Sequence, residues 1–436
     1  MNKDFCKVLI ISNSILNEDN ATSITLKNMF SGWPVDKLAI IYTSLDKNIS
    51  NSIYPVFHVS ELKYLANKTN SSNVLLNNIR SSRGEVKGVQ GTAGDSSLKS
   101  RIFNYIHTIA SSYKAMFPYK YSNELEKFVS EFNPDVIYSI LSSIAAMDIT
   151  LRLSNKFKIP IVPHFMDDWP HTIYENDILL FLPRLKKKYF LKKVLKNTRT
   201  GIAISDKMAK EYNSEYHKEF YSLMNCVSLP DSNEGIEIAK NNKKIEFSYF
   251  GGLHLLRWQT LKTFFESLEI NARYSMDNFE FRIYAPESDR IRYENQFAQL
   301  SSVLFCDRVS QSALFSEMIK SDYLIHVEAF DEKMKKYTRL SISTKIPEYL
   351  VIQKPIVAIG PADVASIEYL RDNKCAHVIS DLDSTAISAT LENLFSTEFN
   401  RELLKNALQL FLKNHNTKMQ HQLLQSIFYQ NCNNPI

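Results

Sequence analysis

The chain has 436 residues, of which 44% are hydrophobic and 23% charged, and its formal net charge is +5. A single hydrophobic core stops growing near about 250–300 residues, so this length predicts two domains. The basic residues are spread along the chain except in one run, which argues against a nucleic-acid-binding protein. Five widely spaced cysteines without the spacing of a metal knuckle predict reduced thiols, no disulfide and no structural zinc.

The N-terminal residues lead directly into a strand-like run, and no stretch approaches the roughly 20 apolar residues that cross a bilayer. We therefore expect a cytoplasmic protein. Residues 184–196 combine seven basic residues with apolar residues at helical spacing. This run predicts either peripheral contact with an anionic membrane, at the inner face of the cell membrane, or an ordinary solvated helix packed on a sheet.

Short runs rich in Val and Ile alternate with amphipathic segments, the pattern of parallel sheets covered by helices on both faces. The fold class is therefore predicted to be α/β. The expected strands are Val8–Ser12, Leu38–Tyr42, Val136–Ile140, Pro160–His164, Gly201–Ile204, Tyr221–Val227, Ile245–Gly252, Phe279–Ala285, Val303–Asp307, Tyr323–Ala329 and Pro355–Gly360. The expected helices are Arg257–Ile270, Gln311–Lys320, one through Ile346, and the stretch from Ser396 onward.

A polar segment with a turn signal, Ser228–Phe247, is the expected linker. We place an N-terminal domain at residues 1–228 and a C-terminal domain at 229–409, and we expect a C-terminal helix, about 410–436, to pack back on the first domain. Residues 68–100 are rich in Ser, Asn and Gly, which predicts a loop that is either a tolerated insertion or a lid over an acceptor.

A predicted strand of the second half ends in two glycines, and a basic residue follows near the start of a helix. Gly251 and Gly252 allow backbone to approach a ligand at the carboxyl end of the strand, where open α/β sheets bind ligands. Arg257 then offers a fork of donors to a diphosphate. The alternative is a plain tight turn followed by a solvated arginine.

A second polar group opens a later helix. Ser341, Ser343 and Thr344 fit a helix N-cap, where free N–H groups favour a phosphate, and Lys345 adds a positive charge at the same end. Glu348 lies about one turn further on, where a carboxylate can accept hydrogen bonds from ribose hydroxyls. The alternative is a capping box in which the glutamate bonds only to backbone.

Residues 343–350, Ser-Thr-Lys-Ile-Pro-Glu-Tyr-Leu, and 354–357, Lys-Pro-Ile-Val, resemble the donor-site signature of the retaining GT-B glycosyltransferases (glycosyltransferase family 4-like). Many bacterial enzymes of surface-glycan synthesis belong to this family. The resemblance implies two Rossmann-like domains facing each other across a cleft. It implies that Gly251, Gly252 and Arg257 hold the donor diphosphate and that Glu348 binds the donor ribose. Where the family often has a further glutamate, eight positions earlier, this chain has Leu340, which leaves sugar choice open.

In the first half, the predicted strand Pro160–His164 ends near two acidic residues, Asp167 and Asp168. The resemblance implies that His164 and one of these aspartates lie near the transferred sugar. There an imidazole or carboxylate can stabilise positive character at the anomeric carbon or orient the acceptor hydroxyl. The Asp-Asp pair also permits a divalent-metal interpretation, but adjacent residues of an extended chain point to opposite faces.

Together these features predict a metal-independent, hexosyltransferase-like enzyme of surface polysaccharide synthesis, such as that of lipopolysaccharide or capsule. It would use a nucleotide-diphosphate sugar, with a UDP-sugar favoured, and a glycan or lipid-linked acceptor. The proposed catalytic residues are His164, Asp167, Asp168, Arg257 and Lys345, and the proposed donor-binding residues are Gly251, Gly252, Arg257, Ser343, Thr344, Lys345 and Glu348. The alternatives are a sugar-nucleotide 2-epimerase of the same architecture and a non-catalytic nucleotide-sugar-binding protein.

Overall fold

The computed structural model of the chain consists of two compact units. Unit 1 comprises Met1–Leu223 and His421–Ile436, and unit 2 comprises Met224–Gln420. The structure describes residues 5–14, 16, 20–44, 53–60, 98–117, 121–228, 244–270, 279–310, 312–383, 387, 390 and 392–433.

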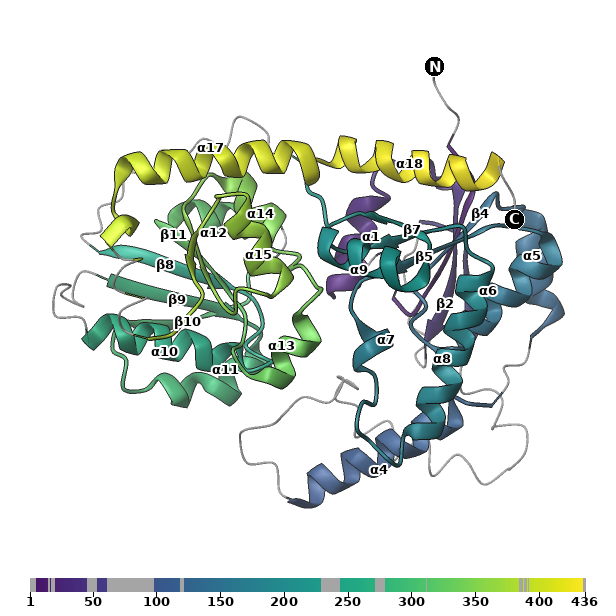
Figure 1. Cartoon of the computed structure of the whole chain (residues 1–436), viewed down its shortest axis with the longest axis horizontal. Helices are drawn as coiled ribbons and strands as arrows, with labels where there is room; N and C mark the ends of the chain where they lie inside the picture. The colour runs from purple at the N-terminus through teal and green to yellow at the C-terminus, as the bar shows by residue number, and fades with distance from the viewer. Residues whose placement is uncertain are drawn as a thin grey trace. The chain divides into compact units, whose positions relative to one another are not determined.

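Unit 1 contains a seven-stranded sheet in the order β3-β2-β1-β4-β5-β6-β7, with every described strand pair parallel (Figure 1). Its strands are β1 (Val8–Ser12), β2 (Leu38–Ser44), β3 (Val56–Ser60), β4 (Val136–Ser139), β5 (Ile161–Phe165), β6 (Thr200–Ala203) and β7 (Glu219–Ser222). Its helices are α1 (Ala21–Met29), η1 (Val35–Lys37), α4 (Leu98–Lys114), α5 (Asn123–Phe132), α6 (Ile144–Phe157), α7 (Trp169–Thr172), α8 (Phe181–Lys196), α9 (Asp206–Tyr216) and most of α18 (Thr417–Asn433).

Both faces of this sheet are buried, as the apolar strands predict. Val8 and Ile10 of β1 face a core that includes residues of α1 and α18, whereas Leu9 and Ile11 face one that includes residues of α5 and α6. Successive side chains of a strand point to opposite faces, so a continuous apolar run is required for a sheet covered on both sides.

The C-terminal helix α18 is part of the unit 1 core. Phe428 is fully buried and its ring packs against those of Phe30, Trp33 and Tyr138, with centroids 5.8–6.4 Å apart. Nearby, the Sγ atoms of Cys432 and Cys6 lie 3.8 Å apart as free thiols. The last helix therefore fills one side of the first sheet.

Unit 2 contains a six-stranded parallel sheet in the order β10-β9-β8-β11-β12-β13. Its strands are β8 (Ile245–Phe250), β9 (Phe279–Ala285), β10 (Val303–Asp307), β11 (Tyr323–Val327), β12 (Ile356–Ile359) and β13 (His377–Ile379). Its helices are α10 (Arg257–Ile270), α11 (Glu287–Tyr293), η4 (Glu294–Phe297), α12 (Leu314–Lys320), α13 (Glu332–Thr338), α14 (Ile346–Ile352), α15 (Ala365–Asp372) and α17 (Thr397–Asn414).

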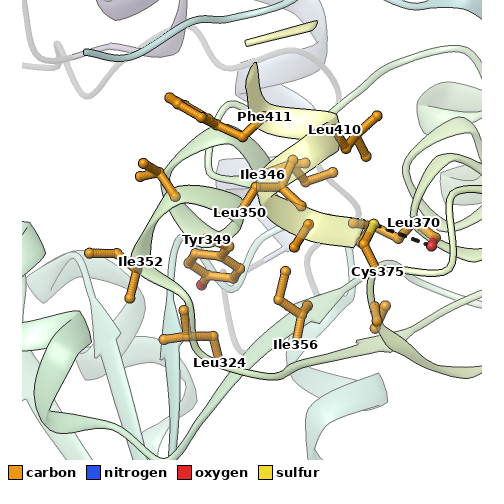
Figure 2. Packing of buried hydrophobic residues seen from close by; sticks show 14 of the residues in the cluster. Leu324, Ile346, Tyr349, Leu350, Ile352, Ile356, Leu370, Cys375, Leu410 and Phe411 are labelled. Atoms are coloured by element: carbon orange, nitrogen blue, oxygen red, sulfur yellow. Dashed lines mark hydrogen bonds between the residues drawn. The ribbon is translucent and has the colours of Figure 1, made fainter. Parts of the chain in front are cut away.

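The unit 2 sheet is also covered on both faces. On one face Leu324 and Ile356 pack with α14 and with Phe411 of α17 (Figure 2). On the other face their neighbours Ile325 and Val357 pack in a cluster that includes residues of α10. Every residue of α14 is buried, so this short helix is held by tertiary packing.

The structure corrects several predicted elements. The strand expected over Tyr221–Val227 ends at Ser222, and Val227 instead forms an isolated bridge to Asn416. The single helix expected from Ser396 onward is two helices, α17 and α18, separated at residues 415–416. β3 and β13 were not among the expected strands, because each is short.

The units divide between residues 223 and 224 and between 420 and 421, compared with the expected boundaries after 228 and 409. The reason is local packing, because Met224 and Val227 belong to a core cluster of unit 2 and His415 Nδ1 lies 2.9 Å from the carbonyl oxygen of Asn225. Most of the predicted linker and of the predicted 68–100 loop lie outside the described residues, and residues 98–100 belong to α4.

Replacement of Phe428 by Ala should lower the free energy of unfolding of unit 1 by about 3–5 kcal/mol, since it opens a cavity among buried rings. Urea unfolding followed by tryptophan fluorescence would measure the loss. The matched control is Tyr429→Ala on the exposed side of the same helix, which should change stability by less than about 0.5 kcal/mol. Equal losses in both variants would contradict the packing of α18 described here.

Candidate functional site

The strand order of unit 2 reverses beside β8. From β8 the chain continues to β9 and β10 on one side and then returns to β11 on the other. In open α/β sheets, ligands bind at such a switch point, outside the carboxyl ends of the two strands. The residues that follow β8 and β11 are therefore the first candidates for a site.

The turn after β8 carries the two predicted glycines. A Cβ on Gly252 would come within 2.4 Å of the ring of His254, and one on Gly251 within 2.9 Å of the hydroxyl of Tyr249, so side chains do not fit there without movement. Leu255 and Leu256 have left-handed φ angles of 57° and 59°. Consecutive non-glycine residues in this region are strained, and such strain is often found at functional sites.

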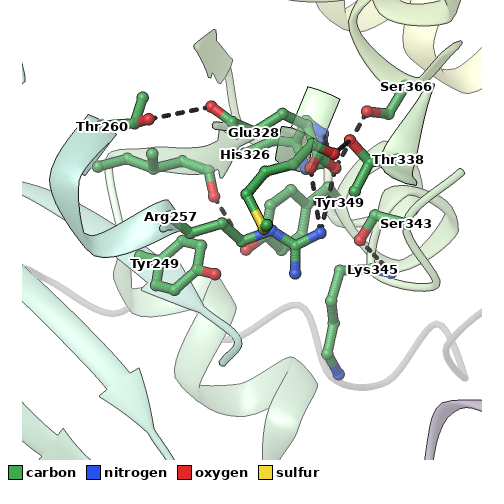
Figure 3. Close-up of polar contacts among 12 residues, drawn as sticks. Tyr249, Arg257, Thr260, His326, Glu328, Thr338, Ser343, Lys345, Tyr349 and Ser366 are labelled. Carbon is green, nitrogen blue, oxygen red and sulfur yellow. Dashed lines mark hydrogen bonds and ion pairs between the residues drawn. The ribbon is translucent and has the colours of Figure 1, made fainter. Parts of the chain in front are cut away.

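This turn delivers Arg257 as the first residue of α10. Its guanidinium donates from Nη2 to both carboxylate oxygens of Glu328, at 3.2 Å each (Figure 3). Glu328 follows β11 directly and its side chain is 3% exposed, while that of Arg257 is 19% exposed. Ser366 Oγ donates to the same carboxylate, and Thr260 Oγ1 donates to the carbonyl of Glu328. The ion pair thus joins the two strands at the switch point.

Glu328 was not among the predicted site residues. The sequence pattern that could have identified Glu328 is an acidic residue directly after the apolar run Tyr323–Val327, because open α/β sheets contact ligands from that position. His326, two residues earlier, has its Nε2 3.7 Å from a Glu328 oxygen. Burial lowers the pKa of His326 to about 4, so it is neutral at physiological pH.

The second predicted group lies at the start of α14, with one correction. The N-cap is Lys345, and no side chain caps the helix; Ser343 Oγ instead accepts from the N–H of Lys345 at 3.3 Å. The carbonyl of Thr344 accepts from Asn225 Nδ2. Lys345 Nζ lies 2.8 Å from a carboxylate oxygen of Glu348, whose side chain is 1% exposed. The two residues predicted to contact phosphate and ribose are therefore paired with each other.

Tyr349 connects α14 to the switch point. Its hydroxyl accepts from the N–H of Phe250, the last residue of β8, and donates to the carbonyl of Ile325 in β11. Tyr349 thereby places the start of α14, with Lys345, near the carboxyl ends of β8 and β11, where the Arg257–Glu328 pair lies (Figure 3). Two cations at such an edge can bind an anion with several phosphate oxygens.

Leu340, which occupies the position of a frequent family glutamate, is fully buried. It therefore presents no polar group to a ligand in this structure.

The predicted residues of unit 1 lie in β5 or shortly after it. His164 is fully buried, and its Nδ1 forms a hydrogen bond with the hydroxyl of Tyr138 on the neighbouring strand. Burial lowers the pKa of His164 to about 3, so the imidazole is neutral. In this position it supports the core of the sheet, and direct contact with a substrate would require neighbouring side chains to move.

The adjacent aspartates have different neighbours. Asp167 accepts from the N–H of Trp169 and is close enough to Lys187 to interact with its charge. Burial raises the pKa of Asp167. The ammonium of Lys187 donates to the carbonyl of Ser142 and lies 4.2 Å from the ring centroid of Trp169, and burial lowers its pKa to about 8.

Asp168 is almost fully buried and accepts from the hydroxyl of Tyr212 at 2.8 Å. Its carboxylate lies 2.6 Å from His171 Nδ1, and the other ring nitrogen of His171 lies 2.9 Å from Glu215. Hydrogen bonding to Asp168, reinforced by Glu215, raises the pKa of His171 to about 8. Within the part of the chain that the structure describes, no group of three or more His, Cys, Asp or Glu side chains is arranged to hold a metal ion.

The His171 pair predicts a pH-dependent stability. Since the folded-state pKa lies above the ordinary value of 6.5, the contribution of the imidazolium is fully present below about pH 6.5 and is lost as the pH rises through 8. The melting temperature of the wild type should therefore exceed that of His171→Gln at pH 6 and approach it by about pH 9. Lys187 is present in both the wild type and the variant, so its own titration affects both melting temperatures equally. The control is His107→Gln, which replaces an exposed histidine of α4. A difference for His171→Gln that is the same at every pH would contradict this assignment.

No protein-family model matches the sequence, and no curated protein is detectably similar to it in sequence. Solved structures are similar in fold. HepE from Anabaena, in complex with UDP, has a TM-score of 0.61 at 10% identity over 97% of this chain and 100% of that one. The N-terminal domain of a Candida albicans trehalose-6-phosphate phosphatase has a TM-score of 0.62 at 12% identity over 98% of each chain. A glycosyltransferase from Rickettsia africae has a TM-score of 0.58 at 10% identity over 98% of this chain and 99% of that one.

These similarities cover nearly the whole chain at 10–12% identity, so they speak to the fold. With its parallel sheets of seven and six strands, and with α18 returning to the core of the first, the chain has the GT-B fold of two Rossmann-like domains, which confirms the fold class expected from the sequence.

Proposed function

We propose that this protein is a glycosyltransferase that moves a sugar from a nucleotide-diphosphate donor, favouring a UDP-sugar, to an acceptor. The observation that carries the proposal is the largely buried Arg257–Glu328 pair at the switch point of unit 2, with Lys345 at the start of the neighbouring helix α14. Its fold is shared with HepE, which has been crystallised with UDP and with UDP-glucose.

In this proposal unit 2 binds the donor. Arg257 and Lys345 contact the diphosphate, and backbone at Gly251, Gly252, Ser343 and Thr344 approaches it closely. Both cations have carboxylate partners, so the diphosphate competes with Glu328 and Glu348 for them. When the bond to the sugar breaks, negative charge grows on the leaving phosphate, and the two cations stabilise that charge without a metal ion.

Glu348 has the role of ribose acceptor. Its carboxylate is held by Lys345 at the first turn of α14, two residues beyond the start of the helix. When phosphate attracts the lysine, the carboxylate becomes available to the 2′- and 3′-hydroxyls. The Lys345–Glu348 pair would then couple phosphate recognition to ribose recognition.

Unit 1 is proposed to bind the acceptor. Asp167 and Asp168 are the candidates to orient its hydroxyl, with His164 as their buried neighbour along the same chain segment. From the family resemblance we propose a hexosyl transfer with retention of configuration, which proton NMR of the first-formed product reports. The same resemblance, together with the basic helix α8, favours a glycan or lipid-linked acceptor of lipopolysaccharide or capsule synthesis at the cytoplasmic face of the membrane.

The donor site is tested by replacing Arg257. Arg257→Gln should weaken UDP binding, measured by titration calorimetry, by about tenfold or more, because a charge-assisted hydrogen bond is lost. The UDP affinity of Arg257→Lys should lie between those of the wild type and Arg257→Gln, since lysine keeps the positive charge but not the forked pair of donors. The control is Arg290→Gln, which removes another ion-paired arginine of unit 2. Wild-type affinity in Arg257→Gln would remove this residue from the site.

The proposed contact of Glu348 with ribose is tested by removing a hydroxyl from the sugar of the nucleotide. The wild type should bind UDP about tenfold more tightly than 2′-deoxy-UDP, and Glu348→Gln should lose most of that preference, because a carboxylate accepts hydroxyl hydrogen bonds better than an amide. The ratio of the two affinities, rather than either affinity alone, separates ribose recognition from loss of the Lys345 pair. An unchanged ratio would exclude contact with the 2′-hydroxyl. An assay of donor turnover separates the alternatives to a glycosyltransferase. Conversion of the nucleotide sugar to its 2-epimer in the absence of an acceptor would favour an epimerase. Absence of any turnover would favour a nucleotide-sugar-binding protein.

A further inference from the structure

Helix α4 presents apolar side chains to solvent. Phe103 is 61% exposed and Ile106 is 58% exposed, and Ile102 lies on the same part of the helix with half its surface exposed. Of the described side chains of α4, only that of Ser112 is buried. A helix with apolar residues at helical spacing normally buries them against a core, so this one lacks such a covering within its described surroundings.

The segment that precedes α8 continues this apolar surface. Ile178 is 90% exposed, and Phe181 and Leu182 at the start of α8 are about half exposed. Asp177 fixes the segment, because its carboxylate accepts from the N–H groups of Leu179 and Leu180 and from the hydroxyl of Tyr105 in α4. The hydrogen bond to Tyr105 therefore holds this apolar segment beside α4.

Helix α8 divides its apolar residues between core and solvent. Leu191, Val194 and Leu195 in its C-terminal half are buried, as expected of a helix packed on a sheet. Leu185 and Tyr189 in its N-terminal half are about half exposed. The end of α8 nearest α4 therefore extends the same surface (Figure 1). We define the apolar patch as Phe103, Ile106, Ile178, Phe181, Leu182 and Leu185.

The charged residues of α4 and α8 are all basic. Helices α4 and α8 contain ten Lys and Arg residues and no Asp or Glu. These ten exceed the formal net charge of the whole chain, +5, so the rest of the chain is net negative. Lys192, Lys193 and Lys196 of α8 are exposed, and Lys193 Nζ lies 4.5 Å from the ring centroid of Tyr189. Basic side chains beside exposed apolar rings suit an interface that is apolar in depth and anionic at its surface.

We propose that the apolar patch inserts into an anionic lipid surface, with the exposed lysines of α8, Lys192, Lys193 and Lys196, bound to the headgroups. No helix among the described residues is long and apolar enough to cross a bilayer, so this contact would lie in the plane of the interface. A protein partner or a second copy would need its own acidic rim, whereas anionic lipid supplies negative charge around an apolar interior. The proposal extends the membrane contact suggested for residues 184–196 to α4 and to Ile178, and it does not depend on sugar transfer.

The full chain should sediment with vesicles of phosphatidylcholine and phosphatidylglycerol in equal parts, and weakly with phosphatidylcholine alone. The triple variant F103S/I106S/I178S should lower the partition coefficient by about tenfold or more, because three apolar side chains no longer leave water. K192E/K193E should lower it as well, and added salt should weaken binding by the wild type, since exposed charges are screened.

The matched apolar control is I291S/L412S, which removes exposed apolar residues of unit 2 outside the apolar patch. The matched charge control is K405E/K413E on α17. Both should bind vesicles like the wild type. So should Arg257→Gln, so that a failure of the donor-site proposal and a failure of this one are distinguishable.

Three results would overturn the proposal. The first is equal sedimentation of the wild type with both kinds of vesicle, and the second is unchanged binding by the triple variant. The third is a wild type that binds no vesicles but sediments as a dimer in analytical ultracentrifugation, with the triple variant a monomer. That third result would assign the apolar patch to a second copy of the chain.

Discussion

The ion pair between Arg257 and Glu328 is the constraint on which the candidate site depends. Removing an arginine and a glutamate from water is costly, and their attraction offsets that cost only with good geometry and further hydrogen bonds. The pair has both, because one nitrogen contacts two oxygens at 3.2 Å and Ser366 donates to the same carboxylate. Such a pair is weak evidence for stability, since apolar residues often pack as well. Its location between β8 and β11 makes anion binding the better explanation.

Strain in the preceding turn supports the same conclusion. Leu255 and Leu256 hold left-handed angles that cost roughly 1–3 kcal/mol each, although glycine would adopt them freely. They lie between the glycine turn and α10, and Leu256 directly precedes Arg257, the first residue of that helix. A cation fixed by strain on one side and by a buried carboxylate on the other loses little freedom when a phosphate arrives. Preorganisation of this kind is expected of a binding site more than of a structural ion pair.

The sequence was sufficient for the architecture and for part of the site. Continuous apolar runs predicted the buried strands, because parallel sheets covered on both faces require them. Lys345 and Glu348 were found because they lie in one short motif, whereas Glu328 lies 71 residues from its partner and becomes visible only when β8 and β11 are neighbours. The predicted N-cap was wrong because hydroxyl residues that favour capping also occur in turns just before a helix. Ser343 is in such a turn, where its Oγ accepts from the N–H of Lys345.

Helix α8 shows why residue type alone could not separate the two interpretations of the basic run. Within one turn of the helix the side chains have different environments. Lys187 is half-buried over the ring of Trp169 beside Asp167, whereas Leu185 and Tyr189 are exposed. The run is therefore a packed helix on one side and a surface on the other, and both interpretations hold for different residues. Lys187 also connects the two proposals for unit 1, because α8 carries both its contact with the candidate acceptor residues and part of the apolar patch. A lipid surface that held the exposed side of α8 would fix the position of Lys187 and Asp167 relative to the headgroups, as recognition of a lipid-linked acceptor requires.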